Sequence, residues 1–315
     1  MLNRRHLRIK VLQTLYAYNQ SEEKEVSKFE KSLLNNVDQV YEMYIWLLNL
    51  LIEVADYTMI DAEGRARKHL PTENDLNNNL RFHDNAFIEA LRKNGKFIDQ
   101  TKKYRVSWAF DPEIAREIFQ NLKNSEEYKA YLNQEDHSIA AEKDIIKYVF
   151  KRIILQLPAV EQVFEEKFIN WQLDKEVLQA LVAKTFKNFS SVDFSKNHLA
   201  ELTPNWDEDR EFILDLFILT ISHSDEYQSF ISGKTKNWEA DRIALMDTLI
   251  MRLAICELIN FSSIPVKVTI NEYIEISKIF STPKSNTFIN GILDKVLSEL
   301  KTSGRIRKQG RGLNE

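Results

Sequence analysis

Glycine, proline and cysteine are scarce in this chain of 315 residues. Seven glycines and six prolines leave few helix breakers, so long helices are the default expectation. The single cysteine, Cys256, excludes an internal disulfide framework and a zinc cluster built on several thiolates. Because Cys256 lies in an apolar helical run, we expect it to be a small buried residue and not a nucleophile.

The chain also lacks the usual signals of a membrane segment and of an enzyme. No stretch approaches the roughly 20 uninterrupted apolar residues that span a bilayer, and the start of the chain has no apolar signal core. We therefore expect a cytoplasmic protein with no membrane partner. The histidines are scattered, and no metalloprotease motif or glycine-rich phosphate loop is present. These absences predict no catalytic residue, no metal and no cofactor.

Charge is unevenly distributed along the chain. A hydrophobic content of 43% indicates a globular protein, and the length suggests about two domain-sized units. The net charge of -4 does not by itself suggest nucleic acid, but both ends are basic. The basic residues are Arg4, Arg5, Arg8 and Lys10 at the start, and Lys301, Arg305, Arg307, Lys308 and Arg311 at the end. Arginines at a helix N-terminus oppose the macrodipole, and a phosphate-bearing partner would explain them.

Apolar periodicity and breakers predict helices along most of the chain. One helix is expected to begin at Asp111-Pro112, with the aspartate as N-cap and the proline in the first turn. Residues 64–104 carry few apolar side chains and many turn residues, which predicts a long loop with one short helix. The expected helices are 4–19, 22–61, 85–93, more than one within 111–132, two or more within 139–189, then 207–222, 225–231 and 238–261.

Residues 268–300 predict two helices joined by a tight corner. Thr269 and Glu272 have the spacing of a capping box, which would start the first helix near Ile270. Thr282-Pro283 would end that helix, and Ser285 would cap the next one.

This stretch carries a family resemblance. The run PVKVTINEYIEISKIF followed by SNTFINGILDK, from Pro265 to Lys295, resembles the C-terminal signature of the NusB family of bacterial transcription antitermination factors. Further upstream, Arg252-Leu253-Ala254 with Glu257-Leu258 resembles another helix of that family, and we expect Arg252 to form an internal ion pair. The arginine-rich start resembles the family's own start through Arg4, Arg5, Arg8, Gln13, Leu15 and Tyr16.

The resemblance covers about residues 1–55 and 205–300 and implies an all-α fold of two packed three-helix bundles. Here the fold would be enlarged by an inserted helical region that has no counterpart in the family pattern. The predicted division is 1–61 for the N-terminal helices, 62–204 for the insertion, 205–300 for the C-terminal bundle and 301–315 for a basic flexible tail.

The resemblance also implies a function. The chain would be an RNA-binding transcription antitermination factor that binds a boxA-type single-stranded RNA of ribosomal-operon leaders. Its partners would be NusE, a small-subunit ribosomal protein, and the RNA polymerase antitermination complex. The expected RNA-binding residues are Arg4, Arg5, Arg8 and Lys10 at the start, and Lys284, Ser285 and Phe288 at the corner. Lys284 stands where many family members carry an acidic residue.

Two other interpretations remain open at the level of sequence. A domain of this family also occurs fused to ribosomal-RNA methyltransferases, but an α/β domain should then follow, and this chain ends 15 residues after Leu300. Alternatively, the protein is a helical protein–protein adaptor that has lost specific RNA binding and uses the insertion to hold other proteins.

Overall fold

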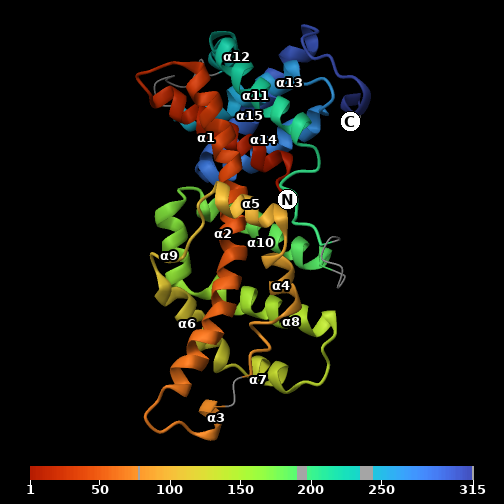
Figure 1. Cartoon of the computed structure of the whole chain (residues 1–315). Helices are drawn as coiled ribbons and strands as arrows, with labels where there is room; N and C mark the ends of the chain where they lie inside the picture. Colours follow the sequence, from red (N-terminus) through yellow and green to blue (C-terminus); the bar gives the residue numbers. More distant parts are fainter. Residues whose placement is uncertain (77–78, 190–196, 235–243, 314–315) are drawn as a thin grey trace. The chain divides into compact units, whose positions relative to one another are not determined.

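All regular elements in the described part of the chain are helical (Figure 1). The computed structural model describes residues 1–76, 79–189, 197–234 and 244–313. The all-α prediction is therefore confirmed. The chain forms two compact units, which we call the terminal unit (residues 2–37 and 203–315) and the central unit (Met1 and residues 38–202).

The long helix α2 (Val26–Ala66) contributes residues to both units. By length and composition it could cross a membrane, but 72% of its most apolar window is buried inside the structure. A core helix of a folded protein shows the same combination, because its apolar faces are covered by neighbouring helices.

The terminal unit is organised around α13 (Leu245–Asn260). This helix contacts α1, α11, α12, α14 and α15, and it is apolar on all sides, as expected for a helix at the centre of a core. Cys256 lies on it and is fully buried, which confirms the prediction for the lone thiol. The surrounding helices are α1 (Arg4–Gln20), α11 (Trp206–Ser222), α12 (Ser224–Lys234), α14 (Val266–Phe280) and α15 (Pro283–Thr302), followed by a short 3-10 turn (Gly310–Leu313).

The predicted capping box at the start of α14 was wrong. The helix begins at Val266, one turn earlier than expected, and Thr269 lies buried inside its first turns. The next corner also differs from the prediction, because Thr282 caps α15 by accepting a hydrogen bond from the Ser285 amide. The side chain of Thr269 instead faces the core, where tertiary contacts outweigh a local cap.

The central unit contains the remaining helices. They are α3 (Glu73–Leu76), α4 (Ala86–Arg92), α5 (Gly95–Lys103), α6 (Pro112–Lys123), α7 (Glu126–Asn133), α8 (Ile139–Tyr148), a π-helical turn (Val149–Ile153), a 3-10 turn (Ile154–Gln156), α9 (Pro158–Lys167) and α10 (Trp171–Asn188). The start of α6 at Pro112 agrees with the prediction, but the side chain of Asp111, at the N-cap position, makes no capping hydrogen bond. Helix α5 was missed by the loop prediction, although Asn94 caps it by accepting from the Phe97 amide.

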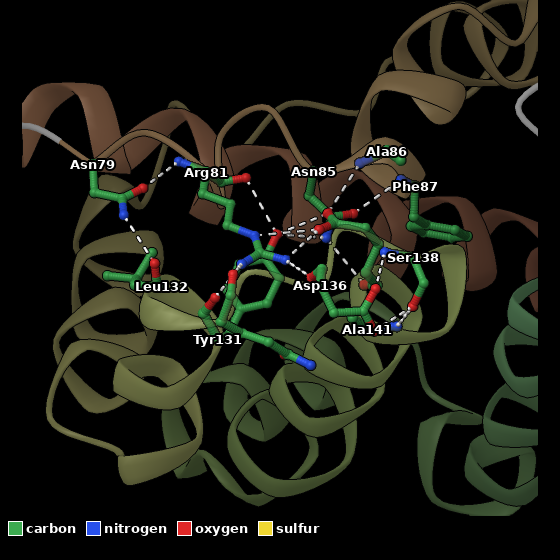
Figure 2. A network of polar contacts seen from close by, with 12 residues as sticks. Asn79, Arg81, Asn85, Ala86, Phe87, Tyr131, Leu132, Asp136, Ser138 and Ala141 are labelled. Atoms are coloured by element: carbon green, nitrogen blue, oxygen red, sulfur yellow. Dashed lines mark hydrogen bonds and ion pairs between the residues drawn. The ribbon is translucent and has the colours of Figure 1, made fainter.

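A buried polar network fixes the segment before α4 against α7 and α8. Figure 2 shows Arg81 directed toward the backbone around Tyr131 and Asp136. Its guanidinium donates to the carbonyl oxygens of Tyr131 at 2.6 Å and Asp136 at 2.5 Å, and pairs with Glu142 at 3.2 Å. Asn85 caps α4 and donates to the Glu142 carbonyl oxygen at 3.0 Å. All these partners are internal, so we assign this network to folding of the central unit.

Candidate nucleic-acid interface

The arginine-rich start of the chain forms the first turns of α1. Asn3 caps the helix by accepting a hydrogen bond from the His6 amide. Apolar residues such as Leu7 and Val11 are completely buried, which anchors one face of α1 in the terminal unit. Arg4 and Arg5 precede this face, and their side chains are 34% and 37% exposed. They are the part of the basic start that reaches the surface.

Arg8 lies inside the unit. Its Nε and Nη2 donate to the two carboxylate oxygens of Glu257 at 2.7 and 2.8 Å, and the two side chains are 2% and 0% exposed. Burial disfavours the charged guanidinium, but the hydrogen bonds and charge of Glu257 outweigh it and raise the pKa of Arg8. Arg8 is therefore a permanently charged partner of a buried carboxylate.

Two residues of α14 complete the surroundings of Glu257. Thr269 donates to one carboxylate oxygen at 2.8 Å and Tyr273 donates to the other at 3.2 Å. Burial, followed by the negative charge of Glu257, raises the pKa of Tyr273 well above its ordinary value, so this hydroxyl stays a donor. The network ties α1, α13 and α14 together.

Carboxylates also face the two surface arginines. Arg4 pairs with Glu208 at 2.6 Å and with Asp209 at 3.0 Å, both at the start of α11. Arg5 makes a bidentate contact with Glu272 at 2.9 and 3.0 Å. These pairs supply the negative charge that we expected a phosphate to provide, and they explain how arginines are tolerated at the N-terminus of α1.

Arg8 and Lys10 were predicted to contact RNA, but the structure buries both side chains. Arg8 is 2% exposed and Lys10 is 1% exposed, so neither side chain is accessible to an RNA strand in this structure. We had expected the basic start to project beyond the packed helices, whereas the α1 turn that carries Arg8 packs against α13 and α14. Of the four basic residues at the start of the chain, Arg4 and Arg5 therefore keep the prediction of direct RNA contact.

An open groove of about 1160 Å³ lies beside Arg4 and Arg5. Phe212 forms part of its lining, and the Arg4 guanidinium lies 4.4 Å from the centre of the Phe212 ring. The turn from Asn260 to Pro265 forms another side. The charged residues of the lining are four cations and four acids: Arg4, Arg5, Arg8, Arg311, Glu208, Glu211, Asp215 and Glu272. The groove therefore carries both signs of charge.

The predicted corner residues lie at the other end of α14. Lys284 is exposed, and Ser285 and Phe288 are half-buried in the first turns of α15. No acidic residue lies in that first turn, so the helix N-terminus and Lys284 form a positive end. At 1.5 Å per residue, the last residue of α14, Phe280, lies about 12 Å along the helix axis from Glu272, and the corner follows it. The groove lining does not include these three residues.

Neither the buried ion pair of Glu257 nor the docking of the tail was predicted from the sequence. Arg252 and Glu257 are the sole charges between Thr248 and Ile259, and we assigned an ion pair to Arg252. Arg252 instead donates to the Gln228 side-chain oxygen at 3.0 Å, and Glu257 makes the buried ion pair. An acid in an apolar run is itself a signal of a buried cationic partner.

The tail differs from the flexible segment that we expected. The Gln309 amide donates to the Ser262 carbonyl oxygen at 3.0 Å, and Lys308 donates to the Phe261 carbonyl oxygen at 2.9 Å. These contacts bring Arg311 to the groove.

Among the residues that the structure describes, no group of three or more histidine, cysteine or acidic side chains is arranged to hold a metal ion. Burial raises the pKa of Cys256 to about 11, so its thiol is protonated near neutral pH.

Comparisons with known proteins agree with the resemblance. The model of the NusB family matches residues 175–298, so it begins inside α10, in the region that we had assigned to the insertion. No solved structure matches the chain.

Three curated relatives carry the name transcription antitermination protein NusB. The protein of Salinibacter ruber is 38% identical over 158 residues, which cover 49% of this chain and 88% of that protein. The protein of Chloroherpeton thalassium is 41% identical over 139 residues, covering 44% of this chain and 49% of the relative. The protein of Dehalococcoides mccartyi is 34% identical over 133 residues, covering 42% of this chain and 92% of the relative. With nearly the full length of two relatives matched, this chain belongs to the NusB family.

Proposed function

We propose that this protein is a cytoplasmic transcription antitermination factor that binds boxA-type leader RNA together with NusE, within the RNA polymerase antitermination complex. The observation that carries the proposal is its similarity, over most of their length, to proteins named for transcription antitermination. The exposed arginines at the groove support the RNA-binding part of the proposal, because guanidinium groups bind phosphate and stack on bases.

Arg4 and Arg5 would exchange their carboxylate partners for RNA phosphates. Both side chains are partly exposed, and an ion pair of this kind contributes at most about 1 kcal/mol. A phosphate offers the same bidentate geometry as a carboxylate, so the exchange has a small net cost. Phe212 is itself buried, and its ring would support the Arg4 guanidinium beside the groove.

The corner of Lys284, Ser285 and Phe288 would form a second contact on the same RNA. Its positive helix end and exposed lysine suit a phosphate, and Phe288 suits a base. A strand that reached both sites would follow α14 from Glu272 to the start of α15.

The test is a titration of the full chain with a boxA-type RNA and with a scrambled RNA, at several salt concentrations, with and without NusE. The double variant Arg4→Ala/Arg5→Ala is compared with Arg67→Ala/Arg116→Ala, which removes the same charge from exposed surface pairs of the central unit. We expect Arg4→Ala/Arg5→Ala to lower the affinity for boxA-type RNA. The slope of log affinity against log salt concentration should become shallower by about 0.7 for each phosphate that is no longer neutralised. The control should bind as the wild type does.

A protein–protein adaptor is the second candidate function. The observation that favours it is the equal number of cations and acids lining the groove, four of each, since a mixed surface suits a protein partner better than a polyanion. The same titration separates the two candidates. Equal affinity of the protein with NusE for boxA-type and scrambled RNA would remove the RNA-binding proposal and leave the adaptor.

A further inference from the structure

We propose that the docked C-terminal tail, residues 305–313, holds Arg311 in the lining of the groove, and that Arg311 binds a phosphate of the single-stranded RNA. This inference rests on the proposed function. It adds a contact from a part of the chain beyond residue 298, where the match to the family model ends.

A sharp turn directs the tail back onto the terminal unit. Gly304 follows the last turn of α15 with φ of +67°, a left-handed conformation that glycine adopts without strain. The Arg305 amide then donates to the Leu300 carbonyl oxygen at 3.0 Å, and the Gly304 amide donates to that of Lys301 at 3.2 Å. This pair of bonds is a Schellman ending, and it reverses the chain direction after α15.

Lys308 and Gln309 fasten the tail to the end of α13. Lys308 donates to the carbonyl oxygens of Phe261 at 2.9 Å and Glu257 at 3.4 Å, at the C-terminal end of the helix, where the macrodipole favours a cation. The Gln309 amide donates to the Ser262 carbonyl oxygen at 3.0 Å. The tail therefore contacts the backbone of Glu257, whose side chain forms the buried ion pair with Arg8.

Gly312 allows the closest approach of the tail. It is buried, and a Cβ at this position would lie 2.0 Å from the Ser262 carbonyl oxygen and 3.1 Å from the carbonyl carbon. A backbone group cannot move aside as a flexible side chain can, so any larger residue would displace the tail. The backbone approach at Gly312 fixes the position of its neighbour Arg311.

Arg311 is exposed and lines the same groove as Arg4 and Arg5. Apart from the buried Arg8, three arginines from the two ends of the chain therefore border one open volume, in which carboxylates face Arg4 and Arg5. A phosphate that entered the groove would meet Arg311 as a further cation. Arg311 thereby adds one positive charge to a lining that carries both signs, which favours the binding of an anionic strand.

The experiment measures boxA-type RNA binding by three variants of the full chain at several salt concentrations. Arg311→Ala removes the proposed contact. Arg307→Ala removes the same charge from the same tail, at an exposed position outside the groove lining. Gly312→Ala keeps every charge and displaces the tail. We expect Arg311→Ala to weaken binding about tenfold and to reduce the salt slope by about 0.7, with Gly312→Ala similar and Arg307→Ala close to wild type.

Backbone amide exchange of the peptide covering the tail reports docking independently of RNA. It should be slow in wild type and in both arginine variants, and faster in Gly312→Ala. Equal RNA affinity of Arg311→Ala and Arg307→Ala would overturn the proposal, as would wild-type affinity of a Gly312→Ala protein whose tail exchanges rapidly. If the wild type with NusE shows no preference for the boxA-type RNA, the proposed function fails instead, and the exchange data still establish whether the tail is docked.

Discussion

Removing Arg8 should destabilise the terminal unit far more than removing any surface arginine. The substitution Arg8→Ala leaves the Glu257 carboxylate fully buried, with the hydroxyl groups of Thr269 and Tyr273 as its remaining side-chain donors. Breaking a buried ion pair by deleting one partner costs about 3–5 kcal/mol. At about 1.4 kcal/mol for each factor of ten, the open form of the unit should become roughly 10² to 4 × 10³ times more populated.

The single cysteine provides the assay. Cys256 lies next to Glu257 on α13 and is completely buried, so a thiol reagent reaches it when the terminal unit opens. Because the pKa of this thiol is raised to about 11, its intrinsic reactivity in the closed unit is also low. The labelling rate at fixed pH therefore follows the population of the open unit, and Arg8→Ala should raise it in proportion.

Two further variants test the cause of the effect. Arg4→Ala removes a partly exposed arginine of the same turn and should cost at most about 1 kcal/mol, or about a fivefold faster labelling. Adding Glu257→Gln to Arg8→Ala removes the orphaned charge and should recover part of the missing stability. A labelling rate for Arg8→Ala no higher than that for Arg4→Ala would refute the assignment of Arg8 to the core.

Three other predictions follow from the same contacts. Glu272→Gln removes the carboxylate that competes for Arg5, so boxA-type RNA should bind about two- to fivefold more tightly in the titration, and weaker binding would contradict the exchange of partners. Arg81→Met leaves Glu142 without its cationic partner and the Tyr131 and Asp136 carbonyl groups without the Arg81 donor, so amide exchange in α7 and α8 should accelerate while exchange in α13 stays unchanged. An equal change of exchange rate in all three helices would count against the network. Burial, opposed by the weaker effect of Glu257, lowers the pKa of Lys308 from 10.5 to about 8. Between these pH values the docked tail binds fewer protons than the free tail, so docking should strengthen as the pH rises through this range. A side-chain NMR titration of Lys308 with a midpoint near 10.5 would exclude the buried position.

Local patterns predicted the helices well where the cause of the helix lies within a few residues. The first helix was expected at residues 4–19 and is Arg4–Gln20, and the start at Pro112 follows from a proline whose φ angle already fits a first turn. Helix α5 was missed because its nine residues, Gly95–Lys103, are mostly polar. Its stability comes from the burial of Phe97 and from contact with α4, which no short pattern reveals.

The candidate site was predicted in part. The positions of Arg4 and Arg5 near a surface were expected, but the same basic run predicted equal roles for Arg8 and Lys10. From Arg4 to Lys10 an α-helix rotates by about 100° at each residue, so these four side chains point in different directions around the helix axis. Which of them are buried depends on where the neighbouring helices pack, and a run of charges does not reveal this. The predicted start of α14 failed for a related reason, because Thr269 had a partner in the core.

The sequence by itself determined that the protein is helical, that Cys256 is buried and that both ends are basic, since periodicity, apolar content and charge are properties of short segments. Only the tertiary structure decided that Arg8 meets Glu257, 249 residues away, and that the tail brings Arg311 to the groove beside Arg4. The physical reason is that ion pairs and docked tails depend on distances between segments that no local pattern encodes. Breaking one such buried pair costs about 3–5 kcal/mol, which exceeds the roughly 1 kcal/mol that a local cap or a helix dipole contributes.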